Sequence, residues 1–449
     1  MAQNLQTHPT VIRFHERDAL RAAAPQHNGA LDAEWLRQVC LEAGADDVGF
    51  VAIDRPELDD QRAEILAAYP RTQALISIVC RMNREPIRSP ARSIANLEFH
   101  RAGDDADGAA HRIVALLERH GVGALNPAVG FPMEVSRFPG KTWVVSHKPV
   151  AVAAGLGQIG IHRNVIHPVF GNFILLSTVL VGAPISQNGQ PIDYNPCLEC
   201  KLCVAACPVG AISSDGAFDF SACFNHNYRE FMGGFSDWVG QLVASHSPED
   251  YRRRVSEGET ASMWQSLSMG ANYKAAYCVA VCPAGEDVIG PFLSDRKTFL
   301  AEVVRPLQQK VEPVYVVPDS DAEQHVRRRF PHKQVRPAGT SLRLNSVEAF
   351  LTYMHIGFKR HRAAGLDLTY HFTFTGAEPA EATVVIRDGT LHVERGHCGA
   401  AQLHITADSQ TWVRFLRKET SLVWSLLRRK IRLRGSPLLL RRFGQCFAT

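Results

Sequence analysis

The chain lacks any long hydrophobic run. Its longest apolar stretch, Phe173 to Val181, is interrupted by Ser177 and Thr178 and falls far short of the roughly 20 residues that a membrane-spanning helix needs. The N-terminal segment has neither the apolar core of a signal peptide nor a twin arginine. We therefore expect a cytoplasmic protein without a transmembrane segment.

The cysteines lack the even number that a disulfide framework needs. The 449 residues include 11 cysteines, of which seven lie between Cys197 and Cys282. Clustered thiols in a chain without an export signal are typical of metal ligands in a reducing compartment. Seven is one fewer than two four-cysteine clusters require. We expect the four scattered cysteines to be ordinary residues: Cys40, Cys80, Cys398 and Cys446.

The composition excludes a disordered or repeat-built chain. Hydrophobic residues make up 45% and charged residues 21% of the sequence, and the length fits two to four domains of about 100–200 residues. The net charge is only +4, yet the part from Gly339 onward has 16 Lys/Arg against 8 Asp/Glu. This surplus of positive charge could bind nucleic acid, anionic lipid or an acidic ligand. We favour a solvated basic face and expect no specific nucleic acid partner.

The first part of the chain, residues 30–185, predicts an α/β domain. Apolar residues at helical spacing predict helices over Ala33–Glu42 and Ala110–His120, the second ending at Gly121. Four apolar segments predict buried strands. They are Asp47–Ile53, Ala74–Cys80, Trp143–Ser146 and Phe173–Val181.

Four cysteines followed by a proline match the bacterial ferredoxin pattern C-x2-C-x2-C-x3-C-P. They are Cys197, Cys200, Cys203 and Cys207, with Pro208 next. In two-cluster ferredoxins the first three thiolates bind one cluster and the fourth binds the other. A zinc ribbon would instead use two separated C-x2-C pairs. Residues 186–295 are therefore predicted to form a ferredoxin-like iron–sulfur domain.

A second, incomplete array follows the first. Cys223 stands alone, and Cys278, Cys282 and Pro283 repeat the C-x3-C-P ending. By the same exchange of ligands, Cys282 completes a [4Fe-4S] site, and Cys207 joins a second site. The predicted first set is Cys197, Cys200, Cys203 and Cys282, and the second is Cys207, Cys223 and Cys278.

The second site lacks one thiolate, because Ala275 stands where its other cysteine would be. It could hold a [3Fe-4S] cluster, or a [4Fe-4S] cluster with a labile or non-cysteine ligand. Asn225, His226 and Asp287 are near in sequence, and nothing selects among them. The alternative is that no second cluster exists and its cysteines are structural.

Gly155, Gly157 and Gly160 form a G-x-G-x-x-G pattern. In a dinucleotide site that pattern follows a strand, opens a helix and precedes an acidic residue by about 20 positions. Here the preceding residues, 149–154, are alanine-rich and predict a helix, and no acidic residue occurs between Gly155 and Asp193. The pattern instead indicates a tight turn where backbone approaches some other large cofactor.

The last part, residues 341–449, predicts an α+β domain. It follows a linker at 296–340, where charges and prolines replace periodicity. An amphipathic helix is expected over Ser346–Lys359, and Asp388-Gly389 favours a hairpin turn because that pair accepts positive φ. Helices are expected again from Ser409. The predicted strands are His371–Thr375, Thr383–Arg387, Leu391–Glu394 and Gln402–Thr406.

Residues from about 35 to 290 resemble the epoxyqueuosine reductase and reductive dehalogenase group. The likeness rests on the segment from Lys148 to His162, the buried strand after it, and the cysteine order from Cys197 to Pro283. In that group a nitroreductase-like domain binds cobalamin near the glycine segment, and two iron–sulfur clusters feed it electrons. The resemblance implies these cobalamin-binding residues: Gly155, Gly157, Gly160 and His162.

The chain departs from that group at two positions. Lys141 stands where epoxyqueuosine reductases have an acidic proton donor, and Ala275 replaces the group's eighth cysteine. A lysine could donate a proton if burial lowered its pKa, so Lys141 is the candidate catalytic residue. It could equally bind an anionic substrate or lie on the surface. Both departures argue against true epoxyqueuosine reductase activity and leave another cobalamin-dependent reduction open.

Residues from about 346 to 448 resemble a sterol carrier protein type two-like domain. The likeness rests on the segments that begin at Phe372, Val384, Leu403 and Lys430. Such domains enclose an apolar tunnel, which implies a lipid or acyl ligand. A filled core would have the same periodicity. The residues that could line a tunnel are Trp412, Phe415, Leu416, Leu422, Trp424 and Leu426.

Two functions are compatible with these features. The first is an iron–sulfur oxidoreductase, a cobalamin-dependent reductase of an unknown, hydrophobic small molecule. Its electrons would come from an external donor, such as reduced ferredoxin, flavodoxin or a reductase, and pass through two clusters to cobalt. The alternative is a non-enzymatic ferredoxin-type electron-transfer protein fused to a lipid-binding module.

Overall fold

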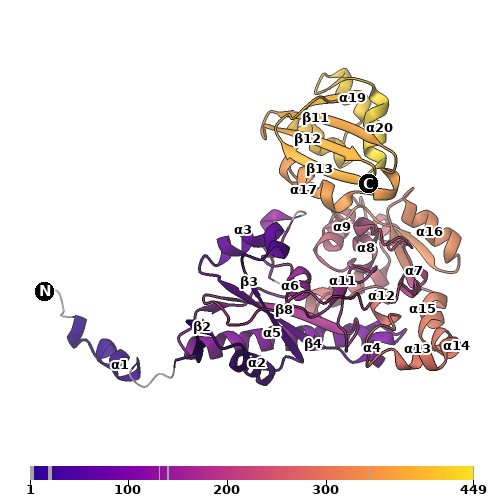
Figure 1. The fold of residues 1–449 in the computed structure, drawn as a ribbon. Coiled ribbons are helices and arrows are strands. Elements are labelled where there is room, and N and C mark those ends of the chain that lie inside the picture. The colour runs from indigo at the N-terminus through magenta and orange to yellow at the C-terminus, as the bar shows by residue number, and fades with distance from the viewer. Residues whose placement is uncertain (1–4, 19–22, 131, 139–140, 343, 448–449) are drawn as a thin grey trace.

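The computed structural model describes residues 5–18, 23–130, 132–138, 141–342 and 344–447. Three bodies follow one another along the chain (Figure 1): an α/β body, a mostly helical body that carries the cysteines, and a C-terminal α+β body. A separate N-terminal helix, α1 (Pro9–Asp18), lies outside the first body. Within the described residues, no helix is long and apolar enough to cross a membrane.

An antiparallel four-stranded sheet, in the order β3-β4-β8-β5, forms the centre of the first body. Helices α2 and α5 cover one face, and α3 and α6 cover the other. Alternate side chains point to opposite faces, so Ile76 and Ile78 contact one layer and Leu75 and Val79 the other. The strands are β3 (Asp47–Ala52), β4 (Ala74–Arg81), β5 (Ala124–Leu125) and β8 (Ile174–Val181), and the helices α2 (Ala33–Glu42), α3 (Asp59–Ala68), α5 (Arg92–Arg119) and α6 (His147–Ala153).

Most sequence predictions for the first body are confirmed. The helix Ala33–Glu42 and three of the four strands are present, and Gly121 follows helix α5 with φ +80°. The predicted helix Ala110–His120 is only the last part of the much longer α5. The strand predicted at Trp143–Ser146 is wrong. Strand β5 pairs with the edge of β8 where this segment could have paired. Trp143 is instead exposed, and Ser146 is the N-cap of α6.

The cysteine body is built from short helices, and the segment predicted to be a linker folds with it. Strands β9 (Pro313–Val316) and β10 (Gln334–Pro337) pair in parallel across α16 (Asp321–Arg329). Val314 and Val326 lie in the same apolar core as Cys203, so 296–340 is ordered structure rather than an extended connection. The other helices are α4 (Arg84–Arg88), α7 (Leu202–Ala206), α8 (Phe220–Asn227), α9 (Met232–Val243), α10 (Pro248–Arg254), α11 (Glu257–Met269), α12 (Tyr277–Ala280), α13 (Gly290–Ser294), α14 (Arg296–Phe299) and α15 (Arg305–Gln309).

The C-terminal body is a five-stranded sheet in the order β13-β12-β11-β14-β15 with helices packed on one face. The four predicted strands and the helix from Ser346 are confirmed, and Asp388 and Gly389 adopt φ of 41° and 76° in the hairpin turn. The coarse expectation of α/β plus α+β bodies is thus confirmed. The elements are α17 (Val347–Gly357), β11 (Asp367–Thr375), β12 (Ala380–Arg387), β13 (Thr390–Arg395), β14 (Leu403–Asp408), α18 (Ser409–Leu416), α19 (Leu422–Leu427), β15 (Ile431–Arg434) and α20 (Pro437–Gln445).

Candidate iron–sulfur and cofactor site

Two loops that share a left-handed residue before a short helix present several of the clustered cysteines. Lys201, with φ 63°, precedes α7 and its Cys203, and Ala276, with φ 50°, precedes α12 and its Cys278. A left-handed residue costs about 1–2 kcal/mol when it has a side chain, so both loops accept strain to make a sharp turn. Helices α7 and α12 are in contact, which brings the two loops together.

The first group of thiols is Cys197, Cys200, Cys203 and Cys282. Burial raises the pKa of Cys282 to about 12, and the neighbouring thiols of Cys200 and Cys197 raise it further. Burial, together with Cys278, Cys282 and Cys200, likewise raises the pKa of Cys203. These electrostatic interactions indicate that the thiols of this group lie near one another.

The second group is Cys207, Cys223 and Cys278. Burial raises the pKa of Cys278 to about 11, and the thiol of Cys207 adds to that effect. The pKa of Cys223 lies well above its usual value because of burial and of both other thiols. The interaction between Cys203 and Cys278 shows that the two groups are neighbours. The structure thus brings the seven thiols into one region, since Cys203 and Cys282 also interact with Cys278 of the other group; their division into two ligand sets and their binding of clusters are part of the proposal below.

Among the described residues, no three His, Cys, Asp or Glu side chains converge closely enough to hold one metal ion.

Two of the residues considered as a fourth ligand in the second group accept hydrogen bonds from other segments, although Nε2 of His226 is buried without a hydrogen-bond partner among the described residues. The side chains of Asn225 and His226 accept backbone hydrogen bonds from more distant segments, at 2.8 and 3.3 Å. Asp287 is exposed. Ala275 is buried, and its N–H donates to Oδ1 of Asn227 at 3.0 Å.

Two other side chains accompany the second group, and sequence reasoning missed both as site residues. Tyr228, directly after α8, interacts electrostatically with Cys223 and Cys278. Lys148 of α6 also interacts electrostatically with Cys223 and Cys278. Its Nζ donates to the carbonyl of Arg163 and to Oδ1 of Asn164, both at 2.8 Å. The sequence offered only weak signals for these two residues. Tyr228 lies five residues after Cys223, and Lys148 begins the segment that resembles the reductase family.

The glycine pattern is required by the chain's own backbone. Gly155 has φ +83°, and a Cβ there would lie 2.5 Å from the carbonyl oxygen of Gln190; at Gly157 it would lie 2.3 Å from that of Ile166. A Cβ on Gly160 would meet the side chain of Ile166, from β7 (Val165–Ile166), at 2.7 Å. The glycines permit a close fold between this turn and its neighbours.

His162, at the end of that segment, reaches toward the second group of thiols. It is only 4% exposed, and burial lowers its pKa to about 4, so the imidazole is neutral. Nδ2 of Asn172 lies 3.3 Å from Nε2 of His162 and 3.5 Å from the carbonyl oxygen of Cys278. One asparagine therefore connects the glycine segment to α12.

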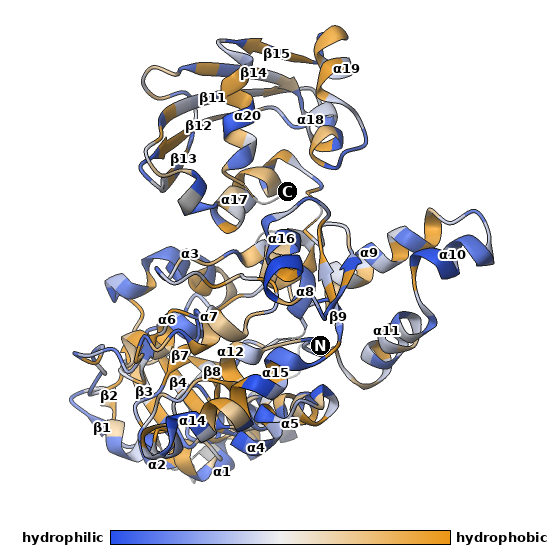
Figure 2. Ribbon diagram, turned by 90° about the vertical axis from the view of Figure 1, so that its right-hand side faces the viewer, coloured by the Kyte–Doolittle hydropathy of each residue, from blue (hydrophilic) through white to orange (hydrophobic). Residues whose placement is uncertain are grey.

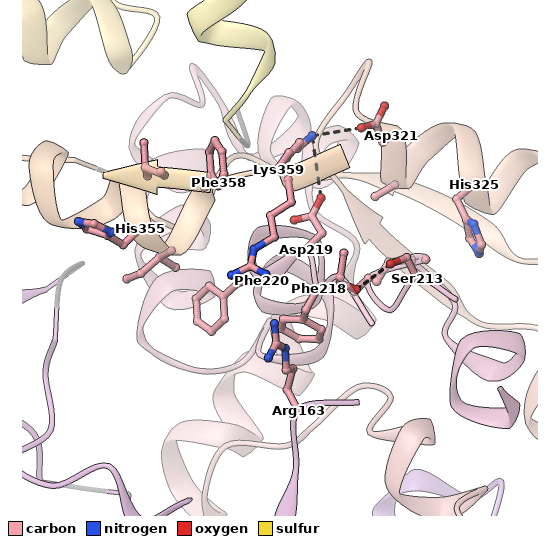
Figure 3. A pocket seen from close by; sticks show the side chains of 18 of the residues that line it. Arg163, Ser213, Phe218, Asp219, Phe220, Asp321, His325, His355, Phe358 and Lys359 are labelled. Carbon is pink, nitrogen blue, oxygen red and sulfur yellow. Dashed lines mark hydrogen bonds and ion pairs between the residues drawn. The ribbon is translucent and has the colours of Figure 1, made fainter. Parts of the chain in front are cut away.

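A cavity of about 850 Å³ opens where all three bodies meet (Figure 3). Lys359 of the C-terminal body reaches across it, with Nζ 3.9 Å from Asp219 and 3.3 Å from Asp321. Arg163 lines the cavity, but among the described lining residues neither His162 nor any of the three glycines appears. The residues after Cys207 that line it are Val209, Gly210, Ala211, Ser213, Ala217, Phe218, Asp219 and Phe220.

Lys141 is not among the described residues that line this cavity, although Trp143, two residues later, is. Its ammonium forms an ion pair with Glu64 of α3, on the layer that covers the first sheet. Its role as a proton donor remains a prediction without geometric support.

The interior of the C-terminal body is filled by aromatic rings. Trp412, 1% exposed, contacts Phe350 and Phe372 at ring-centroid distances of 5.5 and 5.6 Å. Of the residues predicted to line a tunnel, Trp424 was placed wrongly. It is 54% exposed, because α19 turns that side of the helix outward.

Comparisons with known proteins agree with these observations. The family model for the 4Fe-4S binding domain matches residues 191–213. The epoxyqueuosine reductase of Cellulophaga algicola is 30% identical over 245 residues, which are 48% of this chain and 75% of that protein. The chain belongs to the epoxyqueuosine reductase family. Its predicted class, an iron–sulfur oxidoreductase, is thereby confirmed.

Other members of the family match over shorter lengths. The epoxyqueuosine reductase of Escherichia coli is 29% identical over 101 residues, which are 22% of this chain and 26% of that protein. The chain thus spans about a quarter of that relative.

Two solved structures are similar to separate parts of the chain. The epoxyqueuosine reductase of Streptococcus thermophilus is 16% identical with a TM-score of 0.33, over 66% of this chain and 80% of that one. The sterol carrier protein 2 like 2 of Aedes aegypti is 15% identical with a TM-score of 0.16, over 19% of this chain and 86% of that one. At such TM-scores these likenesses carry no argument.

Proposed function

We propose that the chain is a cobalamin- and iron–sulfur-dependent reductase of a small molecule, with a nitroreductase-like first body. One observation carries the proposal. Seven cysteines gather in one region, three of them buried and four half-buried, and the chain that follows Cys207 lines a cavity of about 850 Å³. Electrons entering at the first group would pass through the second toward whatever occupies that cavity.

The cavity suits an organic cofactor or its substrate. Its volume of about 850 Å³ lies within the roughly 300–1,000 Å³ of small-molecule sites. Phe218, Phe220 and Phe358 supply apolar surface, and Arg163, Arg328 and Arg360 supply positive charge. A bound cobalamin would supply a strongly reducing cobalt centre, while the protein orients the reactants. The family resemblance implies Gly155, Gly157, Gly160 and His162 as cobalamin neighbours, but these residues are not among the described residues that line the cavity. The contact that we propose with a corrinoid there is therefore made by lining residues such as Arg163.

The substrate we propose is small, partly apolar and anionic. The C-terminal body lines one side of the cavity through His355, Ile356 and Lys359. Among the described residues, no carboxylate forms an ion pair with the three cavity arginines. They are therefore available to a carboxylate or phosphate of a ligand.

The test is anaerobic reconstitution with iron, sulfide and cobalamin, followed by gel filtration. We expect about one corrinoid per chain to elute with the protein. Ser213→Trp, which fills the cavity, should abolish retention, whereas Ser214→Trp on the neighbouring exposed residue should not. Iron uptake without corrinoid would favour the alternative, an electron-transfer protein fused to a lipid-binding module.

A further inference from the structure

Helix α19 turns an apolar face to solvent. Val423 is 67% exposed, Trp424 54% and Leu427 67%. Successive residues of a helix are about 100° apart, so these three side chains occupy one arc of about 100°. The inward residues Leu422 and Leu426 pack on the core of the C-terminal body. The outer face is therefore not needed for that core.

The surroundings of this face are strongly basic. Residues 411–449 include ten Lys/Arg and one acidic residue, Glu419. Arg428, Arg429 and Lys430 directly follow the helix and are exposed, and the guanidinium of Arg428 lies 5.0 Å from the ring centroid of Trp424. Among the described residues, no carboxylate pairs with Arg428 or Arg429. We call these six residues, 423, 424 and 427–430, the α19 surface.

The α19 surface is accessible to a large partner. Figures 1 and 2 both place α19 at the end of the C-terminal body that is farthest from the other two bodies. A flat surface could therefore approach it without meeting the rest of the protein.

We propose that the α19 surface docks the protein on membranes that contain anionic lipid. Tryptophan and aliphatic side chains insert at the lipid–water boundary, where arginine and lysine bind the headgroup phosphates. A nucleic acid could bind the three basic side chains and stack on the indole of Trp424, but it would leave the aliphatic side chains of Val423 and Leu427 exposed to water. A second copy docked symmetrically would bring two basic surfaces together, which charge repulsion opposes.

Co-sedimentation of the full, reconstituted chain with vesicles tests this proposal. We expect binding to vesicles of phosphatidylcholine and phosphatidylglycerol in equal amounts, weak binding to phosphatidylcholine alone, and release by salt. R428Q/R429Q/K430Q should weaken binding roughly 100-fold, because each basic residue near an anionic surface contributes about fivefold. V423S/W424S/L427S should weaken it by at least about tenfold.

A matched control comes from α11, where Trp264 and Leu267 are each 64% exposed. W264S/L267S should bind vesicles like the unchanged chain, and unchanged circular dichroism should show that every variant is folded. The proposal would be overturned if W264S/L267S lost as much vesicle binding as V423S/W424S/L427S, or if the unchanged chain bound anionic and neutral vesicles equally. The proposal would also be overturned if the protein bound RNA and only R428Q/R429Q/K430Q lowered that affinity. It would be overturned as well if the protein formed a dimer in solution that V423S/W424S/L427S dissociated.

Discussion

Ala275 determines how many thiolates the second cysteine group offers. It precedes the left-handed Ala276, as Cys200 precedes the left-handed Lys201. In the C-x3-C-P register Ala275 corresponds to Cys200, although the loops differ one residue earlier, where Glu199 is left-handed and Lys274 is not. The N–H groups of Ala275 and Ala276 both donate to Oδ1 of Asn227, at 3.0 and 2.7 Å, which fixes the loop without a metal ligand there.

Ala275→Cys should therefore complete the second group. We expect the iron content to rise from about seven to about eight per chain, and a three-iron electron paramagnetic resonance signal to be replaced by a four-iron one. Ala284 is a buried residue beside Cys282, and Ala284→Cys should change neither the iron content nor the electron paramagnetic resonance signal. An unaltered chain that already holds eight irons with a four-iron spectrum would show that a fourth ligand exists.

Two buried histidines make the fold sensitive to acid. His162 and His226 are 4% and 1% exposed, and burial lowers the pKa of each to about 4. In the unfolded chain a histidine takes up its proton near pH 6.5. Below that pH the unfolded state binds more protons, so the stability falls until the pH reaches about 4.

The free energy of unfolding should decrease by up to about 2.7 kcal/mol per pH unit between pH 6.5 and 4 from these two residues. Denaturant unfolding at several pH values measures that slope, and His226→Gln should reduce it by about half of this amount. A slope that His226→Gln does not change would show that this histidine is protonated in the folded protein.

At the scale of elements, the glycine turn after α6 connects several segments. Gly155→Ala should lower stability by about 2–4 kcal/mol, because it adds left-handed strain and a clash with Gln190. Gly258→Ala in α11, where nothing lies within 4 Å of the added carbon, should change stability by no more than about 1 kcal/mol. Denaturant unfolding measures both. Loss of corrinoid binding at full stability in Gly155→Ala would instead assign this glycine to the cofactor.

Elements with strong local signals could be predicted from the sequence. The strands Ala74–Arg81 and Ile174–Val181 come from mostly apolar segments that are interrupted by polar residues such as Ser77 and Ser177. The ferredoxin spacing pointed to the seven cysteines that the structure brings together, and their division into two sets stays a prediction. The segment 296–340 was misread, because a parallel strand pair across α16 depends on contacts with the cysteine helices. Tyr228 was missed for the same reason, since tertiary packing alone brings it to the thiols.

At the scale of the whole molecule, Lys359 connects the C-terminal body to the cavity. Lys359→Met removes the ion pairs with Asp219 and Asp321, so hydrogen exchange should accelerate in residues 355–360 and 213–220. Overall stability should change by only about 1 kcal/mol, the usual worth of such pairs. Arg387→Gln, which breaks an exposed pair with Asp367 within the C-terminal sheet, should leave exchange at the cavity unchanged. Unaltered exchange in Lys359→Met would show that other contacts hold the bodies together.

The central claim is that the second thiol group transfers electrons from the first to a corrinoid in the cavity. The most direct test is the rate at which a reduced external donor reduces protein-bound cobalamin, followed by its absorption spectrum under anaerobic conditions. We expect rapid reduction by the unchanged chain and a rate at least about 100-fold slower in Cys223→Ser, with the first group still loaded. Equal rates in the two proteins would contradict the central claim.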